Sequence, residues 1–468
     1  MIRAFGAVAL AGLLALAAAG TAEARPLTTG FADAVYFDPS PEVRAQWLDR
    51  TVAAGAGIVR LSVAWSGVAR GAPPANPSDP ADPAYDFGLL DQVVGDASER
   101  GLDVLLTVAD APAWAEGPGR PSLAVAPPGT WLPDPVAYGE FARAIASRYS
   151  GSFRPAPLRP PLPRVRLYQA WNEPNLFAHL MPQYEGRRAV SPEHYRRLLD
   201  AFYRGVKGVD ADNLVLSAGT APYGARRGEA LMRPLAFWRS LLCLRKRGLR
   251  PRPCPAEVRF DVAAHHPITG APRSRPDHRD DATIPDLKRI RRIVRKAERS
   301  GQIEPRGRRP LWVTELWWES KPPSRFGVSL KKQARYVAEA LYLIWKQGIG
   351  VAILLQVRDS ITGAPPPAQG LQAGVYFADA RPKPSLTAVR FPFVAERAGR
   401  RALTAWGRSP AAGRLTIERR RRGGGWRVAK RFDVGAGEVF QAIVRARGRA
   451  RLRASVAGET SLPWYQRR

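Results

Sequence analysis

The chain has 468 residues, of which 45% are hydrophobic and 24% are charged, and its formal net charge at pH 7 is +31. This hydrophobic fraction is that of a globular protein, so the composition excludes a chain that is disordered throughout. The length predicts either one large barrel with an appended domain or two to three separate domains.

Residues 1–24 have the layout of a secretory signal peptide. Arg3 precedes an apolar run from Ala4 to Gly20, and Ala22 and Ala24 supply the small residues of a cleavage site after Ala24. An uncleaved membrane anchor is the alternative, although the run is rich in alanine and barely long enough to span a bilayer. We favour cleavage, which predicts a secreted or cell-wall-associated protein with no membrane span in its mature chain.

Eight short, nearly continuous apolar runs alternate with amphipathic segments between residues 25 and 393. Such runs are typical of strands that are buried on both faces of a parallel sheet. The segments between them often begin at Ser or Pro or end at Gly, as helices do. Eight repeats of strand and helix predict a (β/α)8 TIM barrel, whose active site lies at the C-terminal ends of the strands. The apolar runs cover residues 32–37, 57–65, 102–110, 164–171, 213–220, 260–266, 310–316 and 350–357.

An open, doubly wound sheet is the alternative architecture for this alternation. It normally carries a glycine-rich, phosphate-binding turn after its first strand, whereas the first run here is followed by DPSPEV. We therefore favour the barrel and expect no nucleotide cofactor.

The two cysteines, Cys243 and Cys254, enclose the segment LRKRGLRPRP. In an exported protein, a disulfide that closes this short loop is the favoured interpretation. Two free buried thiols are the alternative. No pattern of metal ligands accompanies the cysteines, so we expect no zinc site.

The basic residues are spread over almost the whole chain, and only ten of the 72 are lysine. A large positive charge favours polyanionic partners, among which we count an acidic cell-wall polymer. We interpret the densest basic runs, at residues 291–300 and 417–425, as a solvated helix face and a hairpin tip. No nucleic-acid-binding module is recognisable, so we expect no nucleic-acid partner.

Two acids stand at the ends of predicted strands. Glu173 follows the fourth run, in WNEPN, and Glu315 ends the seventh, in LWVTELWWES. Taken alone, WNEPN is typical of a turn. An acid within an apolar strand, as at Glu315, is costly unless it is paired or used. The barrel places both residues at the same end, so we expect the two carboxylates to converge.

These residues resemble those of glycoside hydrolase clan A, the retaining (β/α)8-barrel glycosidases, and most nearly its β-xylosidase, iduronidase and cellulase-like members. The resemblance covers about residues 30–392. It implies that Glu173, in the pair Asn172-Glu173, is the acid/base and that Glu315 is the nucleophile. It also implies that Arg60, in VRLSVAW of the second strand, supports the nucleophile. Asn172 can then bind a sugar 2-hydroxyl, and its alternative is a turn residue that satisfies its own backbone.

Retaining cleavage needs two carboxyl groups about 5 Å apart. Two acids this close do not both ionise readily. If Arg60 keeps Glu315 ionised, we expect repulsion from Glu315 to raise the pKa of Glu173, which would keep its proton.

The sixth predicted strand ends in HHPIT. Neighbouring residues of a strand point to opposite sides, and we expect His265 rather than His266 to face the acids. A purely structural histidine is the alternative. Similar proteins often have a Tyr where this chain has Ile268, and a Trp on the eighth strand where Gln356 stands. We expect Gln356 partly to replace that Trp.

Aromatic residues near the strand ends are candidates for stacking against sugar rings. Trp114 follows the third strand, while Trp171 and Trp317 flank the two acids. For each of them, packing in the core is the alternative.

Residues 394–468 consist of short alternating runs punctuated by glycine, which predict a small antiparallel β-sandwich after a barrel over 25–393. We favour a bracing role for it over glycan binding through Trp406, Trp426 or Trp464. The whole sequence thus predicts a secreted retaining glycoside hydrolase that acts on carbohydrate and needs no cofactor or metal. A barrel that only binds glycans and a polyanion binder driven by charge are the alternatives.

Overall fold

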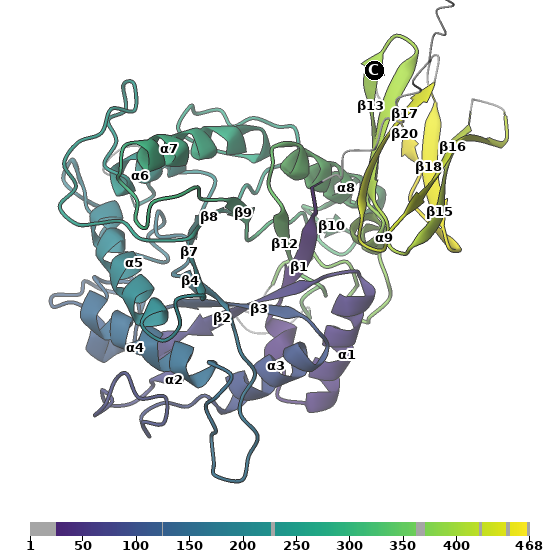
Figure 1. Cartoon of the computed structure of the whole chain (residues 1–468). Helices are drawn as coiled ribbons and strands as arrows, with labels where there is room; N and C mark the ends of the chain where they lie inside the picture. The colour runs from purple at the N-terminus through teal and green to yellow at the C-terminus, as the bar shows by residue number, and fades with distance from the viewer. Residues whose placement is uncertain are drawn as a thin grey trace, which may run out of the picture.

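The computed structural model describes residues 25–123, 125–225, 230–361, 370–420, 424–445 and 450–465. It consists of a closed parallel barrel followed by an antiparallel β-sandwich, as predicted (Figure 1). The expected signal peptide, residues 1–24, lies outside the described residues. Within them, no helix has both the length and the apolar character needed to cross a membrane.

Eight strands close the barrel in the order β1-β12-β9-β8-β7-β4-β3-β2. Every neighbouring pair is parallel, so the C-terminal ends of all eight strands meet at one end of the barrel. The strands are β1 (Thr28–Ala32), β2 (Ile58–Ala64), β3 (Asp103–Ala109), β4 (Leu167–Ala170), β7 (Leu214–Thr220), β8 (Val262–His265), β9 (Leu311–Val313) and β12 (Val351–Leu355).

The first strand differs from the prediction. It ends at Ala32, and most of the expected run 32–37 forms the 3-10 helix η1 (Ala34–Phe37) instead. The cause is Asp33, whose side chain accepts the backbone N–H of Val35 at 2.9 Å and so caps the helix. Its second carboxylate oxygen accepts the N–H of Val357 at 3.0 Å, which ties the first strand to the end of the last.

The helices surround the barrel (Figure 1). Ser40, Asp134 and Ser329 begin three of them, each with a side-chain oxygen that accepts a backbone N–H of the first turn. The α-helices are α1 (Pro41–Ala53), α2 (Trp65–Val68), α3 (Gly88–Glu99), α4 (Pro135–Arg148), α5 (Ser191–Lys207), α6 (Pro234–Leu241), α7 (Leu287–Arg299), α8 (Leu330–Lys346) and α9 (Pro384–Arg390), and two further 3-10 helices are η2 (Ala113–Ala115) and η3 (Ile284–Asp286).

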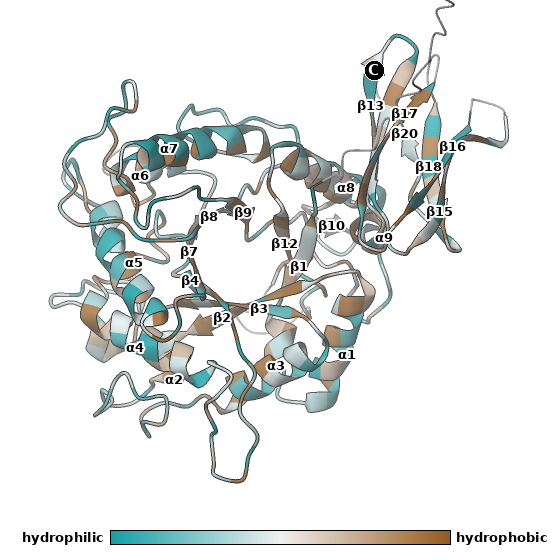
Figure 2. Cartoon of the chain, viewed as in Figure 1, coloured by the Kyte–Doolittle hydropathy of each residue, from teal (hydrophilic) through white to brown (hydrophobic). Residues whose placement is uncertain are grey.

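Side chains fill the inside of the barrel. A cluster separate from the main core takes at least one apolar residue from each of the eight strands, so the barrel is packed rather than open. The main core lies between the strands and the helices, whose outward faces are hydrophilic (Figure 2). The inner cluster consists of the buried residues Ala32, Ile58, Leu105, Leu216, Val262 and Ile353 and of the partly buried residues Leu167, Trp312, Val351 and Leu355 packed against them.

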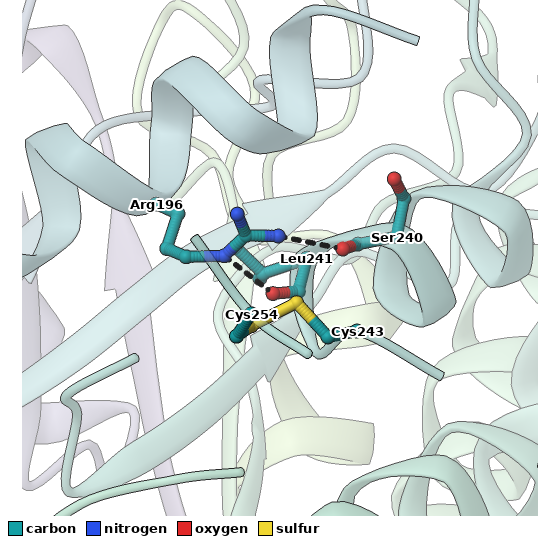
Figure 3. Close-up of a disulfide and its surroundings, with 5 residues drawn as sticks. All are labelled: Arg196, Ser240, Leu241, Cys243 and Cys254. Carbon is teal, nitrogen blue, oxygen red and sulfur yellow. Dashed lines mark hydrogen bonds between the residues drawn. A yellow bond between two sulfur atoms is a disulfide. The ribbon is translucent and has the colours of Figure 1, made fainter. Parts of the chain in front are cut away.

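The expected disulfide is present: Cys243 and Cys254 are joined just after α6 (Figure 3). Arg196 of α5 lies beside it and donates to the carbonyl oxygens of Leu241 at 2.9 Å and Ser240 at 2.7 Å. The buried guanidinium thus fixes the end of α6, from which the disulfide-closed loop departs.

Two short strand pairs lie in loops at the C-terminal end of the barrel. One is formed by β5 (Tyr184–Glu185) and β6 (Arg188–Ala189), after β4. The other is formed by β10 (Ser320–Lys321) and β11 (Val328–Ser329), after β9.

The C-terminal domain is made of two antiparallel sheets, one with the order β13-β14-β17 and one with the order β16-β15-β18-β19, in which β20 also pairs with β18. The strands are β13 (Phe393–Gly399), β14 (Ala402–Arg408), β15 (Gly413–Arg420), β16 (Trp426–Val434), β17 (Val439–Arg445), β18 (Arg451–Val456), β19 (Glu459–Thr460) and β20 (Trp464–Tyr465).

Aromatic packing joins the sandwich to the barrel. Trp406 is fully buried, with its ring centroid 5.3 Å from that of Tyr342 and 5.7 Å from that of Trp345, both on α8. Trp464 is also buried, and the guanidinium of Arg335 lies 3.8 Å from the centroid of its ring. These two tryptophans therefore pack the domain interface and are not exposed to a glycan, which favours bracing.

Candidate active site

The turn after β4 holds its residues in an uncommon backbone conformation. Trp171 and Glu173 have φ angles of 72° and 36°, in the left-handed region that residues other than glycine rarely adopt. The N–H of Trp171 donates to Val108 O at 2.9 Å, and the N–H of Glu173 donates to Gly219 O at 3.0 Å. Conformations of this kind persist where the surroundings impose them, and they cluster at functional sites.

Asn175 fastens the same turn to the segment after β7. Its Oδ1 accepts the N–H of Ala221 at 2.9 Å, and its Nδ2 donates to Met232 O at 2.9 Å. The side chain is fully buried, so this latch is shielded from water. The geometry of the turn therefore depends on a residue that carries no chemistry itself.

The structure brings Glu173 and Glu315 together. A carboxylate oxygen of each and a ring nitrogen of His266 all lie within 4.8 Å of one another. The side chains of Glu173 and Glu315 are 12% and 15% exposed, so both acids can be reached from solvent. They stand just beyond the C-terminal ends of β4 and β9.

Arg60 of β2 forms hydrogen bonds with both Glu315 and Asn172. Its guanidinium donates to Glu315 Oε2 at 3.0 Å and to Asn172 Oδ1 at 2.8 Å. Its Nε donates to Thr107 Oγ1 at 2.9 Å and also lies 3.2 Å from Gln169 Oε1. Because the side chain is only 3% exposed, its positive charge acts on Glu315 with little screening by water.

His266, not His265, faces the acids, so the expectation for this pair is wrong. His266 Nδ1 lies 2.8 Å from Glu173 Oε1 and Nε2 lies 3.0 Å from Thr314 Oγ1. His265 belongs to β8 and points away, toward Thr220 Oγ1 at 2.8 Å and the carbonyl of Ala282 at 2.9 Å. The side chains of His265 and His266 do point to opposite sides, as expected. The one that faces the acids is His266, one position later and beyond the end of β8.

Gly219 makes room for the imidazole of His266. A Cβ atom at this position of β7 would lie 2.0 Å from His266 Nε2, closer than any real contact. The glycine is therefore required by the close approach of a side chain from the neighbouring strand.

Burial sets the charge states of this cluster. It raises the pKa of Glu173 above its ordinary value, while the positive charges of His179 and Arg60 oppose that rise. The pKa of Glu173 is raised, as expected, but the cause is burial and not repulsion from Glu315. Burial also lowers the pKa of His266 to about 3, although Glu315 opposes the shift, so His266 is neutral at ordinary pH.

His179 was not anticipated from the sequence. Its Nε2 lies 3.3 Å from Asn172 Nδ2 and 3.7 Å from Glu173 Oε2, and its carbonyl accepts the indole N–H of Trp171 at 2.8 Å. It stands in an irregular loop after β4, where no periodicity or motif marks it. Only the turn of the chain brings it back over the acid six residues earlier.

The aromatic candidates differ in their surroundings. Trp171 is fully buried and packs against Tyr138 with 5.3 Å between ring centroids, so it belongs to the core. Trp114 is half-buried and meets Trp65 edge to face at 5.5 Å. Trp317 is half-buried and makes no ring contact or hydrogen bond within the described part of the chain. Of these three tryptophans, Trp317 is therefore the one with no aromatic ring packed against it among the described residues.

Gln356 follows the end of β12 and is 9% exposed. Its Nε2 donates to Ser360 Oγ at 2.9 Å, while its Oε1 has no hydrogen-bond partner among the described residues. Gln356 lies at the C-terminal end of the barrel strands, as the two acids do, but little of its surface is available to a ligand.

Two carboxylates and an imidazole within 4.8 Å would also suit a cation. The guanidinium of Arg60 already lies 3.0 Å from Glu315, however, and would repel a metal ion bound to that oxygen. The arrangement is better suited to two carboxylates that exchange a proton than to a metal centre.

No protein-family model matches the chain, and no curated protein matches it either. Among solved structures, it is similar to a glucosidase from Croceicoccus marinus, with 14% identity over 93% of this chain and 96% of that one and a TM-score of 0.51. The GH39 enzyme from Xanthomonas axonopodis pv. citri has 14% identity over 91% and 92% of the two chains, with a TM-score of 0.52. A GH39 beta-xylosidase from Caulobacter crescentus has 16% identity over 91% and 96%, with a TM-score of 0.52. At these identities the likeness shows the fold, a parallel barrel of the kind found in clan A.

Proposed function

We propose that this protein is a retaining glycoside hydrolase that cleaves β-glycosidic bonds of an oligosaccharide or polysaccharide. The observation that carries the proposal is that carboxylate oxygens of Glu173 and Glu315 lie within 4.8 Å of each other. Retaining glycosidases hold their two carboxyl groups about 5 to 5.5 Å apart, whereas inverting enzymes keep about 6.5 to 9.5 Å for a water molecule. The spacing supports double displacement through a covalent intermediate.

In the first step Glu315 is the nucleophile and Glu173 the general acid. The Glu315 carboxylate attacks the anomeric carbon and forms an ester, while the glycosidic C–O bond breaks and its oxygen takes the proton of Glu173. The bond from Arg60 to Glu315 favours the ionised form of the nucleophile. The raised pKa of Glu173 favours the protonated form that the acid requires.

In the second step the roles follow from the change in charge. Once Glu315 is esterified it is neutral, so the positive charge of Arg60 is no longer balanced and stabilises a Glu173 carboxylate instead. Glu173 then takes a proton from water, the water oxygen attacks the anomeric carbon, and the ester bond to Glu315 breaks.

Asn172 is oriented for substrate. Its Oδ1 accepts a hydrogen bond from Arg60 at 2.8 Å and its Nδ2 lies 3.3 Å from His179 Nε2, so the second N–H of Nδ2 is left to donate to a sugar hydroxyl. Trp317 is the candidate for stacking against a sugar ring beside Glu315. The names of the structural neighbours, a glucosidase and a beta-xylosidase, support a carbohydrate substrate for the same barrel.

We further propose that the enzyme is exported, because residues 1–24 have the layout of a signal peptide. The disulfide between Cys243 and Cys254 supports an oxidising compartment. Mass spectrometry of the secreted protein from an expressing bacterial host, with cleavage after Ala24 as the expected result, tests this part.

The test of activity is a panel of aryl β-glycosides with the wild type, Glu315→Ala and Glu173→Ala. We expect turnover by the wild type, loss in Glu315→Ala, and partial rescue of Glu173→Ala by azide, because this anion attacks the covalent intermediate without a general base and an aryl leaving group needs little protonation. NMR of the first product should show the β anomer. Glu319→Gln, in the same segment, is the control for loss of a carboxylate that does not join the pair. Inversion of the anomer, or glycan binding without turnover, would contradict the proposal.

A further inference from the structure

One face of α7 and the disulfide-closed loop enclose a strongly basic hollow. The helix has 13 residues, LKRIRRIVRKAER, of which seven are basic. Its outer face, together with Gly248 and Leu249 of the loop, lines a cavity of about 380 Å³. We call this the α7 basic surface, and its cations are Lys288, Arg291, Arg292, Arg295, Lys296 and Arg299.

A second hollow continues the positive charge. It has a volume of about 160 Å³ and shares Arg291 and Arg295 with the first, while Arg308 and Arg309 form another of its sides. The two hollows therefore make one continuous basic area, which the hydropathy colouring shows as a hydrophilic outer helix (Figure 2).

Few carboxylates neutralise this area. Asp286 pairs with Arg289 at 3.3 Å, and Glu298 accepts the backbone N–H of Arg309 at 2.6 Å. Among the ion pairs of the described residues, none involves the six cations of the α7 basic surface. Burial and the neighbouring cations Arg295 and Arg308 lower the pKa of Arg291, so the cations crowd one another. A bound anion would relieve this repulsion.

The disulfide-closed loop beside α7 is itself basic. Its segment LRKRGLRPRP contains five basic residues and no acid. Leu249 packs against the main core, which holds the loop beside α7, and Lys246 pairs with Asp280 at 3.5 Å. The basic loop therefore lies beside α7, and Gly248 and Leu249 are its residues that line the hollow.

This surface lies away from the proposed active site. Ala263, Leu311 and Gly348, which line the second hollow, stand at or before the N-terminal ends of β8, β9 and β12. The C-terminal ends of the same strands lead to His266, Glu315 and Gln356. An occupant of the α7 basic surface would therefore leave the acids accessible.

We propose that the α7 basic surface binds an acidic polysaccharide and so holds the enzyme on an anionic glycan matrix. The six cations span about 16 Å along the helix, which suits a chain of repeated anionic groups better than a single small anion. Most are arginines, whose planar guanidinium groups bind carboxylate, sulfate or phosphate oxygens through paired hydrogen bonds.

The chemistry of the lining favours this occupant over nucleic acid. No aromatic residue lines either hollow, so nucleic-acid bases would have no ring on which to stack. The choice of a sugar polymer rests on the proposed function, whereas the cation cluster itself does not.

The test uses the mature protein carrying Glu315→Ala, so that binding is measured without turnover and independently of the proposed activity. Fluorescence anisotropy would follow labelled polygalacturonate and a sulfated polysaccharide at increasing salt. The test variant is Arg292→Gln/Arg295→Gln/Lys296→Gln. Its matched control is Arg427→Gln/Lys430→Gln/Arg431→Gln, three exposed cations of β16 that give the same change in net charge.

We expect affinity that weakens with salt, and a loss of roughly tenfold or more in the α7 variant against a small loss in the β16 control. Equal losses in both variants would show that net charge alone is responsible and would overturn the proposal. Tighter binding to duplex DNA or to phosphatidylglycerol vesicles than to both polysaccharides would overturn the sugar polymer as occupant. Thermal unfolding of both variants checks that each remains folded.

Discussion

His266 Nδ1 lies 2.8 Å from Glu173 Oε1, and this contact joins the end of β8 to the turn after β4. Because His266 is buried and neutral, one of its two ring nitrogens carries a proton and the other accepts one. Thr314 Oγ1, 3.0 Å from Nε2, can donate or accept. The pair can therefore accommodate Glu173 both as the acid and as the carboxylate, without a change in net charge at the histidine.

The first prediction concerns the glycine that admits this histidine. Gly219→Ala would place a Cβ atom 2.0 Å from His266 Nε2, so the imidazole must move away from Glu173. We expect kcat/KM to fall by about 10²-fold, the cost of a displacement near 1 Å, with a stability loss of about 1 to 3 kcal/mol. Gly95→Ala is the matched control, because a Cβ there meets nothing within 4 Å. Full activity in Gly219→Ala would show that the position of His266 does not matter.

A second prediction separates the paired contacts of Arg60 with Glu315 and Asn172 from the effect of its buried positive charge. Arg60→Lys keeps a charge but cannot contact Glu315 and Asn172 together, so we expect kcat to fall on the order of 10²-fold. The control is Arg44→Lys, since Arg44 is equally buried and bonds Asp96 and Gln92 away from the site. Arg44→Lys should lower the melting temperature and leave kcat unchanged. Equal kcat values for the two variants would contradict a catalytic role for Arg60.

The sequence predicted the barrel because each of its strands is buried on both faces and so reads as a continuous apolar run. The expected convergence of Glu173 and Glu315 followed from the same count, since strand ends of a barrel converge, whereas Arg60 was named from the resemblance to clan A. Asp33 shows where this reasoning fails, because one side chain that caps a 3-10 helix moved the first strand by several residues.

The rest of the site depends on contacts that leave no periodic signal. His179 approaches Glu173 through a loop, and the Gly219 requirement arises from a side chain 47 residues later in the sequence. The choice of His265 over His266 failed because it turned on the single residue at which β8 ends. Likewise, the run at 291–300 was interpreted as a solvated helix face, and only the fold places Gly248 and Leu249 of the disulfide-closed loop beside its cations.

A third prediction concerns a buried ion pair that joins the loops after β9 and β12. Lys383 Nζ lies 2.5 Å from Asp359 Oδ1, both side chains are fully buried, and the lysine also donates to Ser320 Oγ at 2.8 Å. Lys383→Met would leave the Asp359 charge unpaired, and we expect a loss of about 3 to 5 kcal/mol in the free energy of unfolding. Adding Asp359→Asn should restore part of that loss in urea titrations.

The exposed pair Arg414–Asp433, at 2.9 Å on the sandwich, provides the comparison. Arg414→Met should change the free energy of unfolding by about 1 kcal/mol or less, because water screens exposed ion pairs. A similar effect for the two substitutions would mean that the Lys383 pair does not anchor the loops.

The last prediction follows from the raised pKa of Glu173, which burial causes. Folding stability from the protonated acid is fully present below its unfolded pKa, near the ordinary value of 4.5, and is lost as pH rises through the higher folded value. Glu173→Gln cannot ionise, so its melting temperature relative to wild type should rise over that pH window, while its activity on glycosides with poor leaving groups is lost. Wild-type kcat should fall over the same window, since general-acid catalysis needs the proton. Thermal unfolding and kcat measured across pH for both proteins check this, and a constant difference in melting temperature would show that Glu173 is not the group that titrates.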